Sequence, residues 1–204
     1  MDSDEEVPLW AKRYPPADIT PHEFEEWIVE VLGSAADALD ELRITPHDRV
    51  TGSDGTFDLD ATVRFRLMGL EFLVVVEAKR HSNPIKRELV QALLSKVQSI
   101  GAQKGVMFST SHFQRGAITF AMAHGIALVS VTEGRFTFET KAAGQSRVMS
   151  REGSRTVFGV PTFVGYTYGL GATKGSVSST RISSEQPEYV RDMLAAAIGP
   201  VPQT

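Results

Sequence analysis

The sequence predicts a mixed α/β domain, and three observations support that fold class. Apolar residues recur at helical spacing over residues 21–33 and 84–100. The continuous apolar run 72–76 is typical of a buried strand. After residue 80 helical and strand patterns alternate, which predicts parallel strands joined by helical crossovers. The expected order of the core is helix, three strands, helix, strand, helix, strand.

The first helix has the clearest boundaries. Thr20 is suited to the N-cap, Pro21 to the first helical position and Glu23 to the capping box. Turn-forming residues at 51–55 and 68–70 separate the three strands that follow, so the last two should form a hairpin. The core elements are expected as strands at 41–50, 57–67 and 72–79, a helix at 84–100, a strand at 105–108, a helix at 113–124 and a strand at 125–131.

The chain divides by composition into an acidic N-terminal arm (1–19), a core (20–133) and a basic extension (134–204). In the extension, alternation predicts a strand at 134–140, and the Val, Phe, Tyr and Thr content of 156–169 predicts one or two more. The Gly, Ser and Thr-rich stretch 169–184 is expected to be mobile, and a short helix is expected at 187–198.

Composition narrows the class of protein. The chain has 204 residues, a net charge of −4 and no cysteine, which excludes disulfides and thiolate metal sites. No signal peptide or membrane-length apolar run is present, so a cytoplasmic protein is expected. Residues 1–60 carry 16 acidic and 4 basic residues, whereas residues 61–204 carry 9 and 17. A basic face for nucleic acid is therefore compatible with the negative total.

Three charged residues indicate a catalytic site. Glu77 and Lys79 end the apolar strand, and residues two apart on a strand share a face. Asp58 lies on the preceding strand and would meet them if the two strands form a hairpin. Carboxylates hold Mg²⁺, which can activate water for phosphodiester cleavage. The alternative is an ordinary charged strand face, but charges left unpaired in so apolar a strand would be costly.

From residue 20 to 131 the chain resembles the Mrr-type restriction endonuclease domain, a branch of the PD-(D/E)xK nuclease superfamily. The resemblance implies a restriction-endonuclease-like core with Asp58 and Glu77 as metal ligands, Lys79 as catalytic lysine and Glu25 as a helix-borne acid near the metal. Five motifs carry it in order: residues 21–25, 52–58, 77–80, 104–111 and 123–129.

The implied activity is a Mg²⁺-dependent DNA endonuclease, with Mn²⁺ able to substitute, that acts in restriction or defence without a small-molecule cofactor. A junction resolvase, repair nuclease or RNase on the same site stays open, as does a catalytically idle DNA-binding module. Asp60 and Gln91 are candidates for supporting the metal site or positioning water. A homodimer is expected, because a double-strand break needs two sites. The candidates for nucleic-acid binding are Arg80, Lys86, Arg87, Lys96, Ser109, Thr110 and Ser111.

Overall fold

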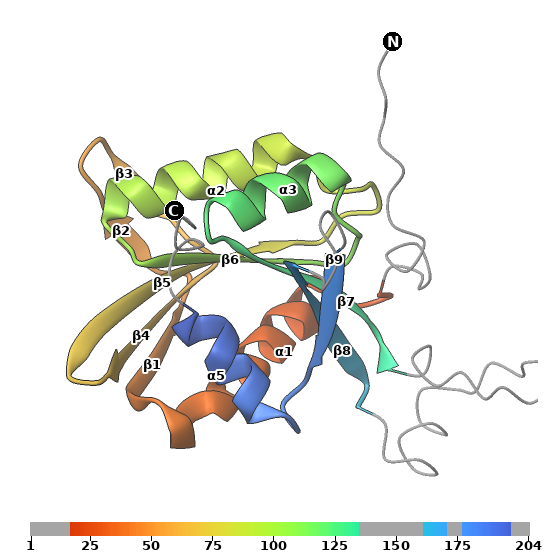
Figure 1. The fold of residues 1–204 in the computed structure, drawn as a ribbon, viewed down its shortest axis with the longest axis horizontal. Coiled ribbons are helices and arrows are strands. Elements are labelled where there is room, and N and C mark those ends of the chain that lie inside the picture. The colour runs from red at the N-terminus through yellow and green to blue at the C-terminus, as the bar shows by residue number, and fades with distance from the viewer. Residues whose placement is uncertain (1–16, 135–160, 171–176, 197–204) are drawn as a thin grey trace, which may run out of the picture.

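A computed structural model describes residues 17–134, 161–170 and 177–196, and it shows a twisted mixed sheet with helices on both faces (Figure 1). The central strands run parallel and the outer ones antiparallel. In spatial order the seven strands are β1 (Asp40–Pro46), β4 (Ala61–Leu67), β5 (Leu70–Lys79), β6 (Lys104–Ser109), β7 (Ala127–Glu133), β8 (Phe163–Leu170) and β9 (Val177–Ile182).

Two helices connect the parallel strands, as expected for helical crossovers. They are α2 (Arg87–Ile100) and α3 (Arg115–Ala123), and they lie together on one face of the sheet (Figure 1). The other face is covered by α1 (Pro21–Gly33), η1 (Ser34–Ala38) and α5 (Pro187–Ala195). Each face has its own apolar core, and the sheet separates the two.

The first helix begins where the sequence predicts it. The Thr20 hydroxyl accepts a hydrogen bond from the backbone N–H of Glu23, whose carboxylate accepts one from the backbone N–H of Thr20. This capping box satisfies two N–H groups that a helix start would otherwise leave unpaired. The apolar face of α1, which includes Phe24 and Trp27, packs against the sheet.

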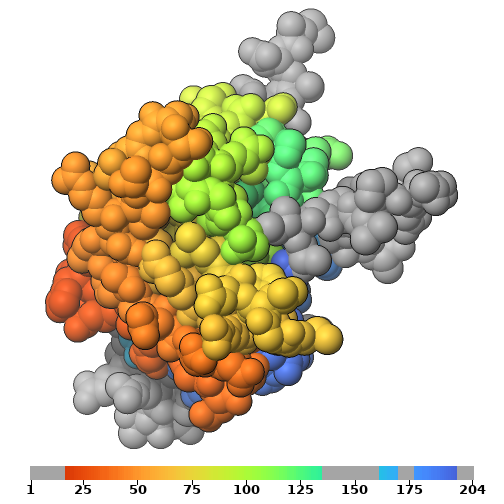
Figure 2. Space-filling view, turned by 90° about the vertical axis from the view of Figure 1, so that its left-hand side faces the viewer, coloured from red at the N-terminus to blue at the C-terminus, as the bar shows by residue number. Residues whose placement is uncertain are grey.

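The strands predicted at 41–50 and 57–67 each divide into two. The inner pieces, β2 (Arg49–Thr51) and β3 (Thr56–Asp58), form a separate antiparallel ribbon. The ribbon loop lies against the end of α2, where the backbone N–H of Ser53 donates to the carbonyl of Ser99 at 2.8 Å. Figure 2 shows the orange surface of this ribbon beside the yellow-green surface of α2. The single strand predicted at 57–67 is therefore wrong at its N-terminal end.

Both crossover helices begin later than predicted. Ile85 forms a parallel bridge with Phe113, so each segment is extended just before its helix. Lys86 and Gln114 are the N-caps, and neither gives a side-chain capping bond. The hydroxyl residues 109–111, which are the nearest candidates in sequence for capping α3, are buried in the preceding strand and loop.

The C-terminal part extends the sheet. β8 pairs with β7 and β9 with β8, so residues 177–182, which lie in the stretch expected to be mobile, form a strand of the sheet. The indole N–H of Trp27 donates to the carbonyl of Phe163 at 3.3 Å and ties α1 to β8. The predicted strand at 134–140 and the first part of 156–169 lie outside the described residues. In the part of the chain that the structure describes, no helix is long and apolar enough to cross a membrane.

Candidate active site

Glu77 and Lys79 lie at the carboxyl end of β5, in the middle of the sheet. The residues before them, Val74 to Val76, are completely buried, because β4 and β6 flank the strand and helices cover both faces. Glu77 and Lys79 alternate with Ala78 and share the face covered by α2, as predicted. The side chain of Glu77 is only 6% exposed, so its charge needs partners within the protein.

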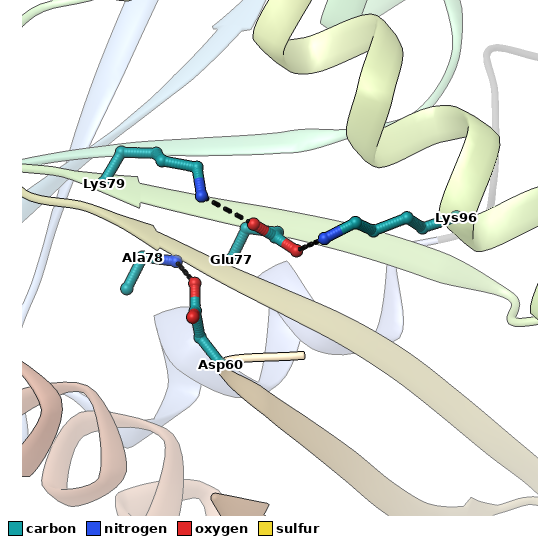
Figure 3. A network of polar contacts seen from close by, with 5 residues as sticks. All are labelled: Asp60, Glu77, Ala78, Lys79 and Lys96. Carbon is teal, nitrogen blue, oxygen red and sulfur yellow. Dashed lines mark hydrogen bonds and ion pairs between the residues drawn. The ribbon is translucent and has the colours of Figure 1, made fainter. Parts of the chain in front are cut away.

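The Glu77 carboxylate has a lysine on each oxygen. Lys79 Nζ lies 2.7 Å from Oε2, and the ammonium of Lys96, which extends from α2, contacts Oε1. The two lysine side chains are about one quarter exposed, at 27% and 26%. Figure 3 shows the two ammonium groups approaching the carboxylate from opposite sides. This pairing allows a carboxylate to be buried without an unpaired charge.

Asp60 joins this group from the neighbouring strand. Its Oδ2 accepts a hydrogen bond from the backbone N–H of Ala78 at 2.6 Å (Figure 3). Ala61 pairs with Val76 in the antiparallel ladder, so continuing that register places Asp60 opposite Glu77. The hairpin of β4 and β5 therefore brings a carboxylate to the end of β5, as predicted, but that carboxylate belongs to Asp60.

Asp58 is placed differently from the prediction. It lies on β3, its side chain is 84% exposed, and its Oδ1 is 3.7 Å from Nε of Arg49 across the ribbon. The reason is the break in the predicted strand at Leu59, which is buried in the core beneath α2 and α3. Asp58 consequently lies in the ribbon, whereas Asp60 directly precedes β4 of the main sheet, and the two do not share one strand face.

The backbone around Asp60 is held by the turn that follows β1. The N–H of His47 donates to the carbonyl of Asp60 at 2.9 Å, and the N–H of Leu59 donates to the carbonyl of Asp48 at 2.9 Å. The Asp48 carboxylate accepts a hydrogen bond from the Thr62 hydroxyl at 2.6 Å. That bond, together with the neighbouring Arg64 guanidinium, holds the pKa of Asp48 below its usual range.

Glu25, the predicted helix-borne acid, reaches this turn. Its Oε2 lies 3.5 Å from Nε2 of His47, and its side chain is 45% exposed. His47 has a positive φ of 49°, an uncommon conformation for a residue other than glycine, and the bond to Asp60 helps to hold it. Glu25 is thus linked to Asp60 through one intervening residue.

The other predicted residues fall into two groups. Gln91, Lys86 and Arg87 are exposed on α2, and the Arg87 guanidinium lies 4.9 Å from the centre of the Phe120 ring. Arg80 is exposed as well, and its Nε donates to the carbonyl of Ile19 at 2.7 Å. Ser109, Thr110 and Ser111 are buried.

The buried hydroxyls brace the loop after β5. The Thr110 hydroxyl bonds both the N–H and the carbonyl of His81 at 3.1 Å, and the backbone N–H of Thr110 donates to the carbonyl of Lys79 at the same distance. The Ser109 hydroxyl accepts from the N–H of Ser111 at 3.0 Å. These contacts hold the chain where it leaves the site.

Lys96 is the residue whose contact the sequence analysis missed. It was expected off the core face of α2 as a contact for phosphate, yet its ammonium turns inward to Glu77. The signal is present in the helical spacing. Leu93 and Val97 are buried, and position 96 falls at i+3 from Leu93, on the edge of the same apolar stripe. A lysine at that position can extend along the core and reach a buried acid.

The donor set fits a small hard cation. Asp60 and Glu77 offer carboxylate oxygens at one edge of the sheet, and Mg²⁺ is commonly bound by one or two carboxylates together with water and substrate phosphate. Within the described ranges, no group of three or more His, Cys, Asp or Glu side chains could form a larger metal cluster. With no cysteine in the chain, a thiolate zinc site is excluded.

Comparison with known proteins gives one family match. The family model for the Mrr-type restriction endonuclease catalytic domain matches residues 16–133, more than half of the chain. Among curated proteins, none matches the chain.

Three solved structures are similar in part. The protein of unknown function AF1548 is 15% identical, over 51% of this chain and 56% of its own, with a TM-score of 0.40. The DNA modification-dependent restriction endonuclease AspBHI is 21% identical, over 63% of this chain and 37% of its own, with a TM-score of 0.36. MspJI restriction endonuclease, in complex with a 27-mer oligonucleotide, is 16% identical, over 63% of this chain and 32% of its own, with a TM-score of 0.37. The matched part of this chain spans only about a third to a little over half of each.

The family match covers every element from α1 to β7 and all four residues of the charged group: Asp60, Glu77, Lys79 and Lys96. The fold, a mixed sheet with α2 and α3 as crossovers, agrees with the core that the sequence predicts. The chain belongs to the Mrr-type family of restriction endonucleases.

Proposed function

We propose that this protein is a Mg²⁺-dependent DNA endonuclease, with Mn²⁺ as a substitute, that acts in restriction. The observation that supports the proposal most strongly is the buried Glu77 carboxylate. It lies beside Lys79 at the carboxyl end of β5, opposite Asp60, which directly precedes β4. Two acids and a lysine gathered at such an edge are the groups that hydrolysis of a phosphodiester needs.

Asp60 and Glu77 are the proposed cation ligands. Asp60 and Glu77 would hold a cation that would supply Lewis-acid chemistry, activating a water and offsetting the charge on the scissile phosphate. The backbone N–H of Ala78 fixes the rotamer of Asp60, so one carboxylate oxygen is oriented and the other can face the cation. Glu25 and His47 support this position from the other side through the carbonyl of Asp60.

Lys79 is the proposed water-orienting residue. Its ammonium already lies 2.7 Å from Glu77, so a water beside the carboxylate is within reach of both groups. An ammonium in this place can also donate to a nonbridging phosphate oxygen and offset its charge. The side chain is 27% exposed, which leaves it accessible to a bound strand.

The N-terminal end of α2 is the proposed first contact for the DNA backbone. The chain leaves β5 at Lys79 and enters α2 at Arg87, so Lys86 and Arg87 lie close in sequence to the site and are exposed. Such cations bind phosphate through charge and release counterions, without reading sequence. Gln91, exposed one turn further along α2, is a candidate for a contact with the same strand.

The proposal is tested by incubating the pure protein with supercoiled plasmid, linear duplex, single-stranded DNA, a four-way junction and RNA. Each substrate is assayed with Mg²⁺, with Mn²⁺ and with EDTA. Cleavage of duplex DNA that requires a divalent cation is expected. Preference for the junction or for RNA would favour the corresponding alternative. Binding without cleavage under every condition would indicate a DNA-binding module and overturn the proposal.

The homodimer stays a prediction. It rests on the need for two sites in a double-strand break, and the apolar residues at 156–169 are a candidate contact surface, but Phe163 and Val164 are buried in the protein's own sheet, at 7% and 0% exposed. Their burial removes part of the reason to expect a second subunit. Light scattering at micromolar concentration, with and without duplex DNA, distinguishes a dimer from a monomer that nicks one strand at a time.

A further inference from the structure

The Glu77 carboxylate contacts two lysines, and its position on β5 accounts for only one of these contacts. Lys79 contacts it as a consequence of strand geometry, since side chains two residues apart lie on the same face. Lys96 comes from a different element, 19 residues further along the chain, and contacts the other carboxylate oxygen. Both oxygens of the proposed cation ligand are therefore in contact with ammonium groups (Figure 3).

The four charged side chains of this group balance one another. Asp60 and Glu77 contribute two negative charges, and Lys79 and Lys96 contribute two positive ones. Glu77 is buried, and a buried charge is tolerated when it is paired and hydrogen-bonded. A divalent cation added to this neutral group would leave two excess positive charges beside the buried Glu77 carboxylate. A cation held by either oxygen of Glu77 would lie next to an ammonium on the same atom, and the repulsion between the two positive charges favours opening one lysine contact.

The contact of Lys96 is the one that can open with least disturbance. Lys79 lies two residues from Glu77 on the same face of a central strand, so the strand itself keeps the two side chains next to each other. Lys96 spans the distance between α2 and β5 with a flexible four-carbon stem. Its side chain is 26% exposed, so another rotamer can take the ammonium toward solvent or toward a bound strand.

On the basis of the proposed function, we infer that Lys96 holds the place of the divalent cation on Glu77 in the free protein. It releases Oε1 when the cation binds, and its ammonium then faces the scissile phosphate, the anion that the substrate brings into the site. Lys96 would thus compete with cation binding and still assist cleavage. Both effects come from the same ammonium group, which exchanges one anionic partner for another.

Titration with Ca²⁺ in the absence of DNA tests the first part of the inference, the competition between Lys96 and the cation for Glu77, because it reports cation binding without turnover. Lys96→Met should bind Ca²⁺ about tenfold more tightly than the wild type, the scale expected when one close charge contact is removed. Arg191→Met removes the same charge from α5, on the other face of the sheet, and should bind as the wild type does. Lys96→Arg keeps the competing charge and should remain close to the wild type. Lys96→Gln provides the same comparison if the methionine variant does not fold.

Thermal unfolding gives a readout that does not depend on activity. Lys79→Met/Lys96→Met leaves the buried Glu77 without either ammonium partner, so its unfolding temperature should fall below that of each single variant. Ca²⁺ should restore more stability to this double variant than to the wild type. A lysine that only packs α2 onto the sheet would lower stability without increasing the response to Ca²⁺. Adding Glu77→Gln to the double variant should remove the response.

Cleavage of duplex DNA at saturating Mg²⁺ tests the second part of the inference, the contact of Lys96 with the scissile phosphate. Lys96→Met should cut at least tenfold more slowly than the wild type in a single-turnover assay, despite its tighter cation binding. If Lys96→Met and the wild type bound Ca²⁺ with the same affinity, the competition would be overturned. If the wild type still cleaved DNA, the proposed nuclease activity would remain. An equal cleavage rate would overturn the phosphate contact. Absence of cation binding in every variant, together with absence of cleavage, would overturn this inference and the proposed function together.

Discussion

The carboxylate of Asp60 accepts a hydrogen bond from the backbone N–H of Ala78 at 2.6 Å, although the two residues are 18 positions apart in the chain. This bond is made by the residue after Glu77 and joins the end of β5 to the residue that directly precedes β4. It places a second acid beside the buried one, and it distinguishes Asp60 from Asp58, which faces Arg49 on a separate ribbon.

Asparagine at position 60 should therefore abolish most cleavage, whereas asparagine at position 58 should not. Asp60→Asn removes a proposed cation ligand with little change in shape, and a loss of about two orders of magnitude or more in single-turnover rate is expected. Asp58→Asn removes only an exposed charge paired at 3.7 Å and should stay within about twofold. Circular dichroism controls for folding. The reverse ranking of the two variants would restore Asp58 as the ligand.

Lys104 should make the stability of the fold depend on alkaline pH. It is 6% exposed at the start of β6, its ammonium donates to the carbonyl of Ala196 at 3.2 Å, and burial lowers its pKa from 10.5 to about 8. Below pH 8 the folded and unfolded states both carry the charge, and the folded state bears the cost of burying it. Between pH 8 and 10.5 the unfolded state binds more protons, so this contribution to the free energy of unfolding rises with pH.

Urea unfolding of the wild type and Lys104→Met at pH 7 and pH 10 measures this effect. The methionine variant should be more stable at pH 7, by roughly 1 to 3 kcal/mol, because it buries no charge. The difference should shrink at pH 10, where the wild-type lysine is largely neutral when folded. A difference independent of pH would mean that the hydrogen bond to Ala196, and not the charge, decides the stability.

Gly52 should be required for the ribbon to dock on α2. A Cβ atom at this position would lie 2.8 Å from the backbone carbon and oxygen of Ser99, closer than such atoms approach in folded proteins. Gly52→Ala should thus move the ribbon and destabilise the protein by about 1 to 3 kcal/mol. Gly55→Ala is the matched control, since its Cβ would meet only the Phe57 ring, at 4.0 Å.

Displacement of the ribbon should also affect the site, because β3 leads directly into Leu59 and Asp60. Ca²⁺ affinity of folded Gly52→Ala should therefore fall relative to Gly55→Ala. Thermal unfolding and calorimetric titration on the same two samples check both effects. Normal stability of Gly52→Ala would show that the ribbon can leave α2 without cost.

Reversal of charge at the start of α2 should weaken DNA binding without affecting the cation. Lys86 and Arg87 are exposed, and each neutralised phosphate contributes a slope of roughly 0.9 in the dependence of log affinity on log salt concentration. Lys86→Glu/Arg87→Glu should lower duplex affinity and reduce that slope by about 2. Fluorescence anisotropy at several salt concentrations measures both. Unchanged binding would place the DNA interface elsewhere, most plausibly on the basic residues after position 134.

Local patterns in the sequence were sufficient for several features of the fold. The Thr20 capping box sets the start of α1, and the apolar run of β5 with Glu77 and Lys79 at its end needs only the two-residue repeat of a strand. The turn at Met68 and Gly69 has positive φ at both residues, in agreement with the predicted hairpin. Each of these features depends on residues close together in the chain, which is why periodicity and turn chemistry reveal them.

Only the tertiary structure decided which residues join Glu77. Asp58 and Asp60 are equivalent in a strand pattern, and the choice of Asp60 follows from the burial of Leu59 and the bond to Ala78. Lys96 becomes a partner of Glu77 because packing of Leu93 and Val97 turns that side of α2 toward β5. The pairing of β9 with β8 likewise overrides a Gly and Ser-rich composition that favours loops. These outcomes depend on contacts between distant segments, and their energies arise from burial that no local pattern contains.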